Sequence, residues 1–179
     1  MAKFLDFGAV AKTNWAKPEI DKRPLWLIAA LCAVLSLIFI FTPAWVSASF
    51  TMNGKLMAEG SAAGISSFHG IVALIGVIVT FYGLLYRQYG FAVVGAALAT
   101  LMALIFLIGH ESAPMTCTYE GAPAKDMSIK MFLISSKQVA SMHGTLPFVS
   151  SGAMGSLLTI VSGAVTAICS YLLYKKSNK

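Results

Sequence analysis

Four long stretches of this 179-residue chain contain no Asp, Glu, Lys or Arg. They are Pro24–Gly54, Gly60–Tyr86, Gln88–Gly109 and Gln138–Tyr174. A helix rises about 1.5 Å per residue, so about 20 apolar residues cross the hydrocarbon core of a bilayer. We therefore expect a transmembrane domain over residues 24–174, with four helices over about 24–45, 66–87, 89–110 and 150–174.

The charged residues predict how the chain sits in the membrane. Only 11% of the residues are charged, and the net charge is +6. Positive charge gathers in residues 1–23, at Arg87 between the second and third stretches, and in residues 175–179. By the positive-inside rule these parts are cytoplasmic, so both termini face the cytoplasm and residues 46–65 and 111–141 form outer loops. This placement indicates contact with membrane lipid rather than with nucleic acid. The N-terminal segment, residues 1–23, is either a short amphipathic helix in the membrane–water interface or a partly ordered tail.

The first outer loop has the pattern of a β-hairpin. Alternating residues flank Asn53-Gly54, a pair typical of a type I′ turn, and Val46 and Phe50 would share one face. The second loop holds the apolar run Ile129–Ile134, which would form a strand or a short helix. The predicted fold class is thus an all-α membrane protein, a four-transmembrane-helix bundle with a small β-containing extracytoplasmic cap. The candidate outer-loop contact residues are Trp45, Phe50, Asn53 and Gly54.

A weak internal echo relates the two halves of the chain. S-F-H-G at Ser67–Gly70 matches S-M-H-G at Ser141–Gly144, and similar short apolar sequences occur in the same order around them. The echo is explained either by a duplicated helix-loop-helix unit or by chance matches between apolar helices.

Three histidines fall near the predicted outer helix ends, at His69, His110 and His143. Two histidines on facing helices could bind haem b, with His69 and His143 as the candidates, and His110 could add a metal ligand. The alternative is interfacial histidines bonded to loop backbone. No ionisable side chain lies within the apolar stretches otherwise, which disfavours a pump. Apart from this alternative no cofactor is predicted.

Small residues predict where helices pack closely. They recur every four positions in the third and fourth stretches, with two more at the start of the fourth: Gly95, Ala99, Ala103, Gly152, Ser156, Thr159, Gly163 and Ala167. They would pack within the bundle or against another subunit. The fourth stretch exceeds one crossing, and we expect a kink or re-entrant piece before Gly152 to absorb the excess.

One family resemblance rests on the end of the first helix. T-P-A-W-V-S-A-S-F at Thr42–Phe50, followed by Glu59-Gly60, resembles the claudin-like tetraspans, which include claudins, peripheral myelin protein relatives and channel γ-subunits. The cysteine signature of that superfamily is absent. The resemblance implies a left-handed four-helix bundle with an outer β-sheet, and it implies that Trp45 anchors the first loop on the bundle.

The favoured function is non-catalytic, because the chain has no nucleophile elbow and no phosphate-binding loop. We expect an accessory or structural subunit of a membrane complex, or a homo-oligomer, that binds other membrane subunits or its own copies through the outer loops. The alternatives are a haem- or metal-binding redox subunit that uses the histidines, and an oligomeric pore-forming tetraspan.

Overall fold

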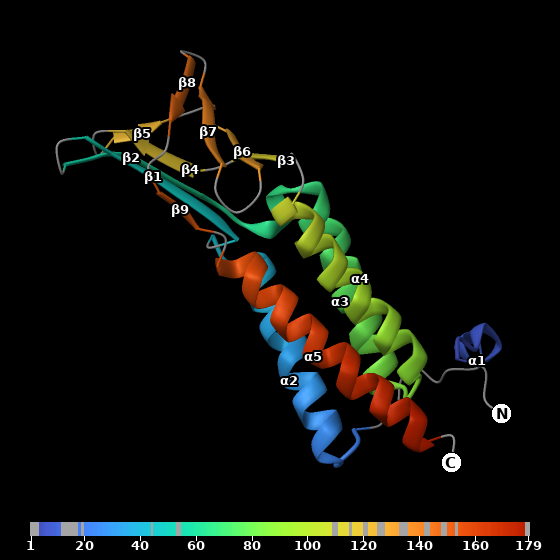
Figure 1. Cartoon of the computed structure of the whole chain (residues 1–179). Helices are drawn as coiled ribbons and strands as arrows, with labels where there is room; N and C mark the ends of the chain where they lie inside the picture. Colours follow the sequence, from blue (N-terminus) through green and yellow to red (C-terminus); the bar gives the residue numbers. More distant parts are fainter. Residues whose placement is uncertain are drawn as a thin grey trace.

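The structure is a computed structural model with a helical part and a β part (Figure 1). It describes residues 4–11, 18, 20–43, 45–52, 55–108, 111–114, 116–119, 122–124, 128–132, 136–141, 144–147, 150–152 and 154–177. All statements on structure concern these residues.

Four helices in the described chain are long and apolar enough to cross a membrane, which confirms the predicted multi-pass helices. They are α2 (Pro24–Phe41), α3 (Phe68–Leu85), α4 (Tyr89–Ile108) and α5 (Met154–Ser177). A short helix, α1 (Phe7–Ala11), precedes them.

Local sequence explains where the long helices begin and end. Pro24 starts α2 at a position where its missing N–H costs nothing. The helix stops at Phe41 rather than near residue 45 because Thr42 is extended and precedes Pro43, which disfavours helical geometry in the residue before it. The Ser67 side chain caps α3 by accepting a hydrogen bond from the Gly70 amide at 3.0 Å.

The four long helices form a bundle in which α3 packs on α4, α4 on α5 and α5 on α2, while α2 contacts α3 less extensively. Both chain termini lie at one end of this bundle, called here the terminal end (Figure 1). The strands lie at the opposite end, called here the sheet end (Figure 1). At the terminal end α3 turns into α4 through Tyr86, Arg87 and Gln88, and Arg87 has a φ of 55°.

The connection between α2 and α3 contains a β-hairpin, as predicted. Strands β1 (Val46–Met52) and β2 (Lys55–Ala62) pair antiparallel, and Met52 opposite Lys55 places Asn53-Gly54 in the connection. These two turn residues, and with them the predicted type I′ geometry, lie outside the described residues. A register shift follows Phe50, since Phe50 pairs with Ala58 and Thr51 with Leu56.

The remaining described strands lie between α4 and α5 and complete two sheets. They are β3 (Glu111–Pro114), β4 (Thr116–Tyr119), β5 (Ala122–Ala124), β6 (Ser128–Phe132), β7 (Ser136–Ser141), β8 (Gly144–Pro147) and β9 (Ser150–Gly152). One sheet has the order β5-β4-β2-β1-β9 and the other β3-β6-β7-β8. The β part therefore joins both loops, because β2 pairs with β4 and β1 with β9.

The structure corrects the prediction for the start of the fourth stretch. Its excess length forms β7, β8 and β9 instead of a kink or re-entrant piece, and α5 begins only at Met154. Gly144, Pro147 and Gly152 interrupt this region, and Gly and Pro disfavour a continuous helix. The two matched segments of the internal echo also differ in secondary structure. Ser67 caps the start of helix α3, whereas Ser141 ends strand β7 and Gly144 begins strand β8.

Candidate functional site

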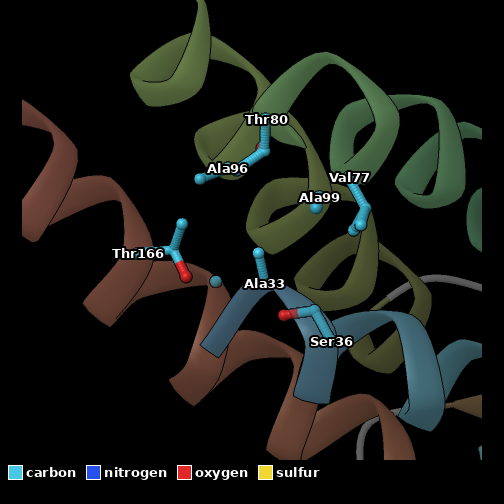
Figure 2. Close-up of a pocket in the computed structure, with 8 residues that line it drawn as sticks. Ala33, Ser36, Val77, Thr80, Ala96, Ala99 and Thr166 are labelled. Carbon is cyan, nitrogen blue, oxygen red and sulfur yellow. The ribbon is translucent and has the colours of Figure 1, made fainter. Parts of the chain in front are cut away.

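A small cavity lies where all four long helices meet, and its lining is shown in Figure 2. Its volume is about 10 Å³, and its lining comes from the four helices in turn: Ala33 and Ser36, Val77 and Thr80, Ala96 and Ala99, and Gly163 and Thr166. Such a volume accepts at most one water molecule. This cavity is thus too small for a substrate or a cofactor.

The hydroxyl groups near this cavity are bonded within the protein. Ser36 Oγ and Ser162 Oγ lie 2.6 Å apart and share a hydrogen bond between α2 and α5. The Thr166 hydroxyl donates to the Ser162 carbonyl oxygen at 2.8 Å, and the Thr80 hydroxyl donates to the Gly76 carbonyl oxygen at 2.9 Å. Because these donors already have acceptors, the hydroxyls stabilise the packing of the helices.

The predicted small residues of α4 lie against α3. Gly95, Ala99 and Ala103 are all buried. A Cβ atom on Gly95 would lie 2.5 Å from the Gly76 carbonyl oxygen and 2.6 Å from the Thr80 amide nitrogen. The two backbones thus touch, so packing within the chain accounts for Gly95.

The α3 residues that complete this contact are not among those predicted from the sequence. A Cβ on Gly76 would lie 2.6 Å from the Gly95 carbonyl oxygen, and one on Gly83 would collide with the backbone of Ala92. Gly76 and Gly83 are seven residues apart, which places them on one face of the helix. That spacing is the signal that could have found them.

The predicted small residues of the fourth stretch divide among three environments. Ser156, Thr159 and Gly163 are buried in α5, and a Cβ on Gly163 would collide with the Thr100 hydroxyl of α4. Ala167 is only half-buried. Gly152 lies in β9, where it pairs with Ser47 of β1.

Trp45 lies at the junction between the bundle and the sheets. Its exposed fraction is 0%, and its ring centroid is 5.6 Å from that of Phe106 on α4. A Cβ on Gly64, in the 3₁₀ helix Gly64–Ser66, would lie 2.9 Å from the indole ring. The indole Nε1 is buried, and the described residues supply no hydrogen-bond partner for it. Trp45 therefore packs as a core residue and not as an interfacial tryptophan with a wetted N–H.

The other outer-loop candidates are less fully described. Phe50 lies in β1 and pairs with Ala58. Asn53 and Gly54 lie outside the described residues.

A polar cluster at the terminal end was not anticipated from the sequence. The Arg23 Nε donates to Asp21 Oδ2 at 2.6 Å, and the Tyr89 hydroxyl donates to the same oxygen at 2.8 Å. The Arg23 amide nitrogen also donates to Asp21 Oδ1 at 2.9 Å. Nearby, Trp26 Nε1 donates to the Leu84 carbonyl oxygen at 2.9 Å, which satisfies an acceptor in the last turn of α3.

The ion pair of this cluster changes the pKa values of both partners. The hydrogen bond from Arg23 lowers the pKa of the Asp21 carboxyl well below its usual range, against the opposing effect of burial. The same hydrogen bond raises the pKa of the Arg23 guanidinium. Both groups are therefore charged at neutral pH, and the cluster fastens the start of α2 to the start of α4.

No protein-family model, curated protein or solved structure matches this chain. The assignment of a function therefore rests on the residues and on their geometry.

The histidines are only partly covered by the structure. His69 is half-buried in the first turn of α3, and its ring lies edge-on to Phe68 with centroids 5.7 Å apart. His110 and His143 lie outside the described residues. Within the described ranges no three His, Cys, Asp or Glu side chains come together as a metal site. The haem or metal alternative thus stays a prediction.

Proposed function

We propose that this protein acts by association and not by catalysis, as an accessory or structural subunit of a membrane complex or as a homo-oligomer that uses its sheets as the binding surface. The observation that carries the proposal is the closed bundle. Its helices touch at backbone distance around Gly95 and leave a central cavity of only about 10 Å³.

The bundle is suited to hold the sheets and not to transport or transform a molecule. Close approach of Gly76 to Gly95 and of Gly163 to Thr100 leaves little space between helices. The outward-facing residues are large and apolar, as expected for contact with lipid chains, and include Leu31, Ile38, Ile75, Ile78, Val161 and Ile168. Both features support a structural role for the four helices.

The sheets are held to the bundle by buried apolar residues. Trp45, Val46 and Ala62, at the bundle-facing ends of β1 and β2, belong to one buried cluster with Phe106 of α4. This cluster couples the orientation of the hairpin to that of the helices. A β surface held in this way is suited to protein recognition, because little conformational freedom is lost when a partner binds.

The charge distribution supports an outward orientation of the sheets. Lys22, Arg87, Lys175 and Lys176 are exposed at the terminal end. The positive-inside rule then places both termini in the cytoplasm and the sheets on the outer side.

The test is cross-linking in native membranes with a membrane-impermeant, amine-reactive reagent applied from the outer side. The reactive lysines of the outer loops are Lys55, Lys125, Lys130 and Lys137. We expect a discrete cross-linked species in the wild type. It should disappear when these four residues are changed to arginine, a change that removes the reactive amine and keeps the charge.

The matched control is Lys175→Arg/Lys176→Arg at the other end of the bundle, which should cross-link like the wild type. A chain that stays uncross-linked and runs as a monomer in mild detergent would overturn the proposal. A Soret band or stoichiometric metal in the purified protein would favour the histidine site instead. Conductance in planar bilayers would favour the oligomeric pore.

A further inference from the structure

Exposed positive charge dominates the terminal end of the bundle. Lys22 precedes α2, Arg87 lies in the turn between α3 and α4, and Lys175 and Lys176 end α5. The carboxylate of Asp21 is engaged by Arg23, and the four basic residues outnumber Asp6, the other described acidic residue of the segment that precedes α2. These four basic residues come from three separate places in the chain. Only the folded bundle brings them together at the terminal end.

The N-terminal segment lies at the same end, and its aromatic side chains hold it there. The Phe4 ring lies edge-on to Tyr174 of α5 with centroids 4.9 Å apart, and the Phe7 ring lies edge-on to Phe91 of α4 at 5.3 Å. The Phe4 carbonyl packs so closely on Gly90 that a Cβ there would collide with it. The segment thus contacts both α4 and α5.

The same aromatic side chains remain largely exposed. The exposed fraction is 69% for Phe7 and 40% for Phe4. Exposed apolar side chains of a segment at a membrane surface, Phe among them, insert at the boundary between headgroups and acyl chains. Residues 1–23 also contain Lys3, Lys12 and Lys17, so the basic residues of this segment outnumber its acidic residues Asp6, Glu19 and Asp21.

We propose that the terminal end is a binding surface for anionic phospholipid headgroups, with Phe4 and Phe7 in the boundary between headgroups and acyl chains. Basic side chains near a membrane surface attract acidic lipids, and neighbouring aromatic rings add apolar contact. The occupant is a lipid and not a soluble anion, because exposed aromatic rings and exposed basic residues lie together at the end of a transmembrane bundle. This surface is opposite the sheets, and its test does not depend on a protein partner there.

The test compares lipid preference in vesicles that contain the full-length protein. Electron paramagnetic resonance of spin-labelled lipids measures the association of phosphatidylglycerol relative to phosphatidylcholine at the protein surface. We expect a preference for phosphatidylglycerol of about three- to tenfold at low salt. The preference should fall towards onefold, which means no preference, in 0.5 M NaCl, because salt screens charges at a surface.

The charge variant is Arg87→Gln/Lys175→Gln/Lys176→Gln, and it should lose most of the preference. The matched control, Lys55→Gln/Lys130→Gln/Lys137→Gln, removes the same number of charges from the strands and should keep it. Phe4→Ala/Phe7→Ala keeps every charge and should lower the preference, because it releases the segment that carries Lys3, Lys12 and Lys17.

Two results would overturn the proposal. One is a wild-type protein with no preference for phosphatidylglycerol at low salt. The other is an equal loss of preference in the two triple variants, which would show that net charge acts without regard to this surface. The salt series uses the wild-type protein alone, so its outcome does not depend on the folding of any variant.

Discussion

Trp45 shows how a single side chain can join two parts of a membrane protein. It is buried among Ile40, Gly64 and Phe106, although tryptophans at helix ends commonly lie in the wet interface. Its Nε1 has no acceptor among the described residues, so its contribution comes from the contact area of the ring.

This leads to a prediction that separates ring packing from hydrogen bonding. Trp45→Phe should cost about 1–2 kcal/mol of unfolding free energy, since it loses only part of the buried apolar area. Trp45→Ala should cost about 3–5 kcal/mol, because it leaves a cavity at the junction. Denaturant unfolding in micelles, followed by far-ultraviolet circular dichroism, measures both values. Equal costs for the two variants would show that the indole N–H matters more than the ring.

Arg87 carries a backbone strain that allows a second prediction. Its φ of 55° lies in the left-handed region, which glycine adopts freely and other residues adopt at a cost. Arg87→Gly and Arg87→Ala both remove the side chain, but only Gly relieves the strain. We therefore expect the Gly variant to be about 1 kcal/mol more stable than the Ala variant. Thermal unfolding of the two variants in the same micelles checks this, and an Ala variant at least as stable as the Gly variant would contradict it.

At the scale of elements, the α3–α4 pair is held by backbone contact. Gly76 faces Gly95, and Gly83 faces Ala92, so each helix leaves room for the other. Without a hydrophobic effect between helices in lipid, such close van der Waals packing is a main source of association.

We expect a single methyl group at this contact to be costly. Gly95→Ala should destabilise the protein by about 1–3 kcal/mol, because the new Cβ would overlap the backbone of α3. Ala97→Leu adds more volume to the exposed face of the same helix and should have little effect. The free energy of unfolding in micelles compares them. A larger effect of the Ala97 change would indicate that the exposed face of α4 is an interface.

The elements themselves were predictable to different degrees. The hairpin β1–β2 was predictable because alternation and Asn-Gly are local signals, and Met52 does pair with Lys55. The strands within residues 138–152 were not, since that region shares its lack of charge with the helix that follows. A charge-free run shows that a segment avoids ionisable groups, and it does not distinguish a strand from a helix.

At the scale of the whole molecule, the Asp21 cluster closes the terminal end of the bundle. Asp21 and Tyr89 are 68 positions apart, and their hydrogen bond links the starts of α2 and α4. Asp21→Asn should destabilise the protein at pH 7 by about 1–3 kcal/mol, because charge-assisted hydrogen bonds are lost. Lys22→Gln changes an exposed neighbour and serves as the control.

The pH dependence of this effect has a definite sign. The pKa of Asp21 is lowered in the folded state from its ordinary value of 3.8, so the unfolded state binds its proton first as the pH falls. The stabilisation is thus complete well above pH 3.8 and is lost progressively below it. The stability difference between the wild type and Asp21→Asn should shrink between about pH 4 and pH 2. A difference that does not change over that range would contradict the assignment.

The two ends of the closed bundle are proposed to have different roles. Proteins are proposed to bind at the sheets, and acidic lipids at the terminal end. A rigid bundle separates these surfaces, since the helices between them are packed at backbone distance around Gly95 and Gly163.

The sequence by itself determined the four long apolar helices and the first hairpin. These depend on local composition and period, because an uncharged apolar run favours lipid wherever its neighbours lie and an Asn-Gly turn needs only its flanking residues. Only the tertiary structure decided which helix each glycine faces, that Trp45 is a core residue, and that Asp21, Arg23 and Tyr89 meet. These facts depend on contacts between residues far apart in the chain, and no local pattern specifies which helix faces come together.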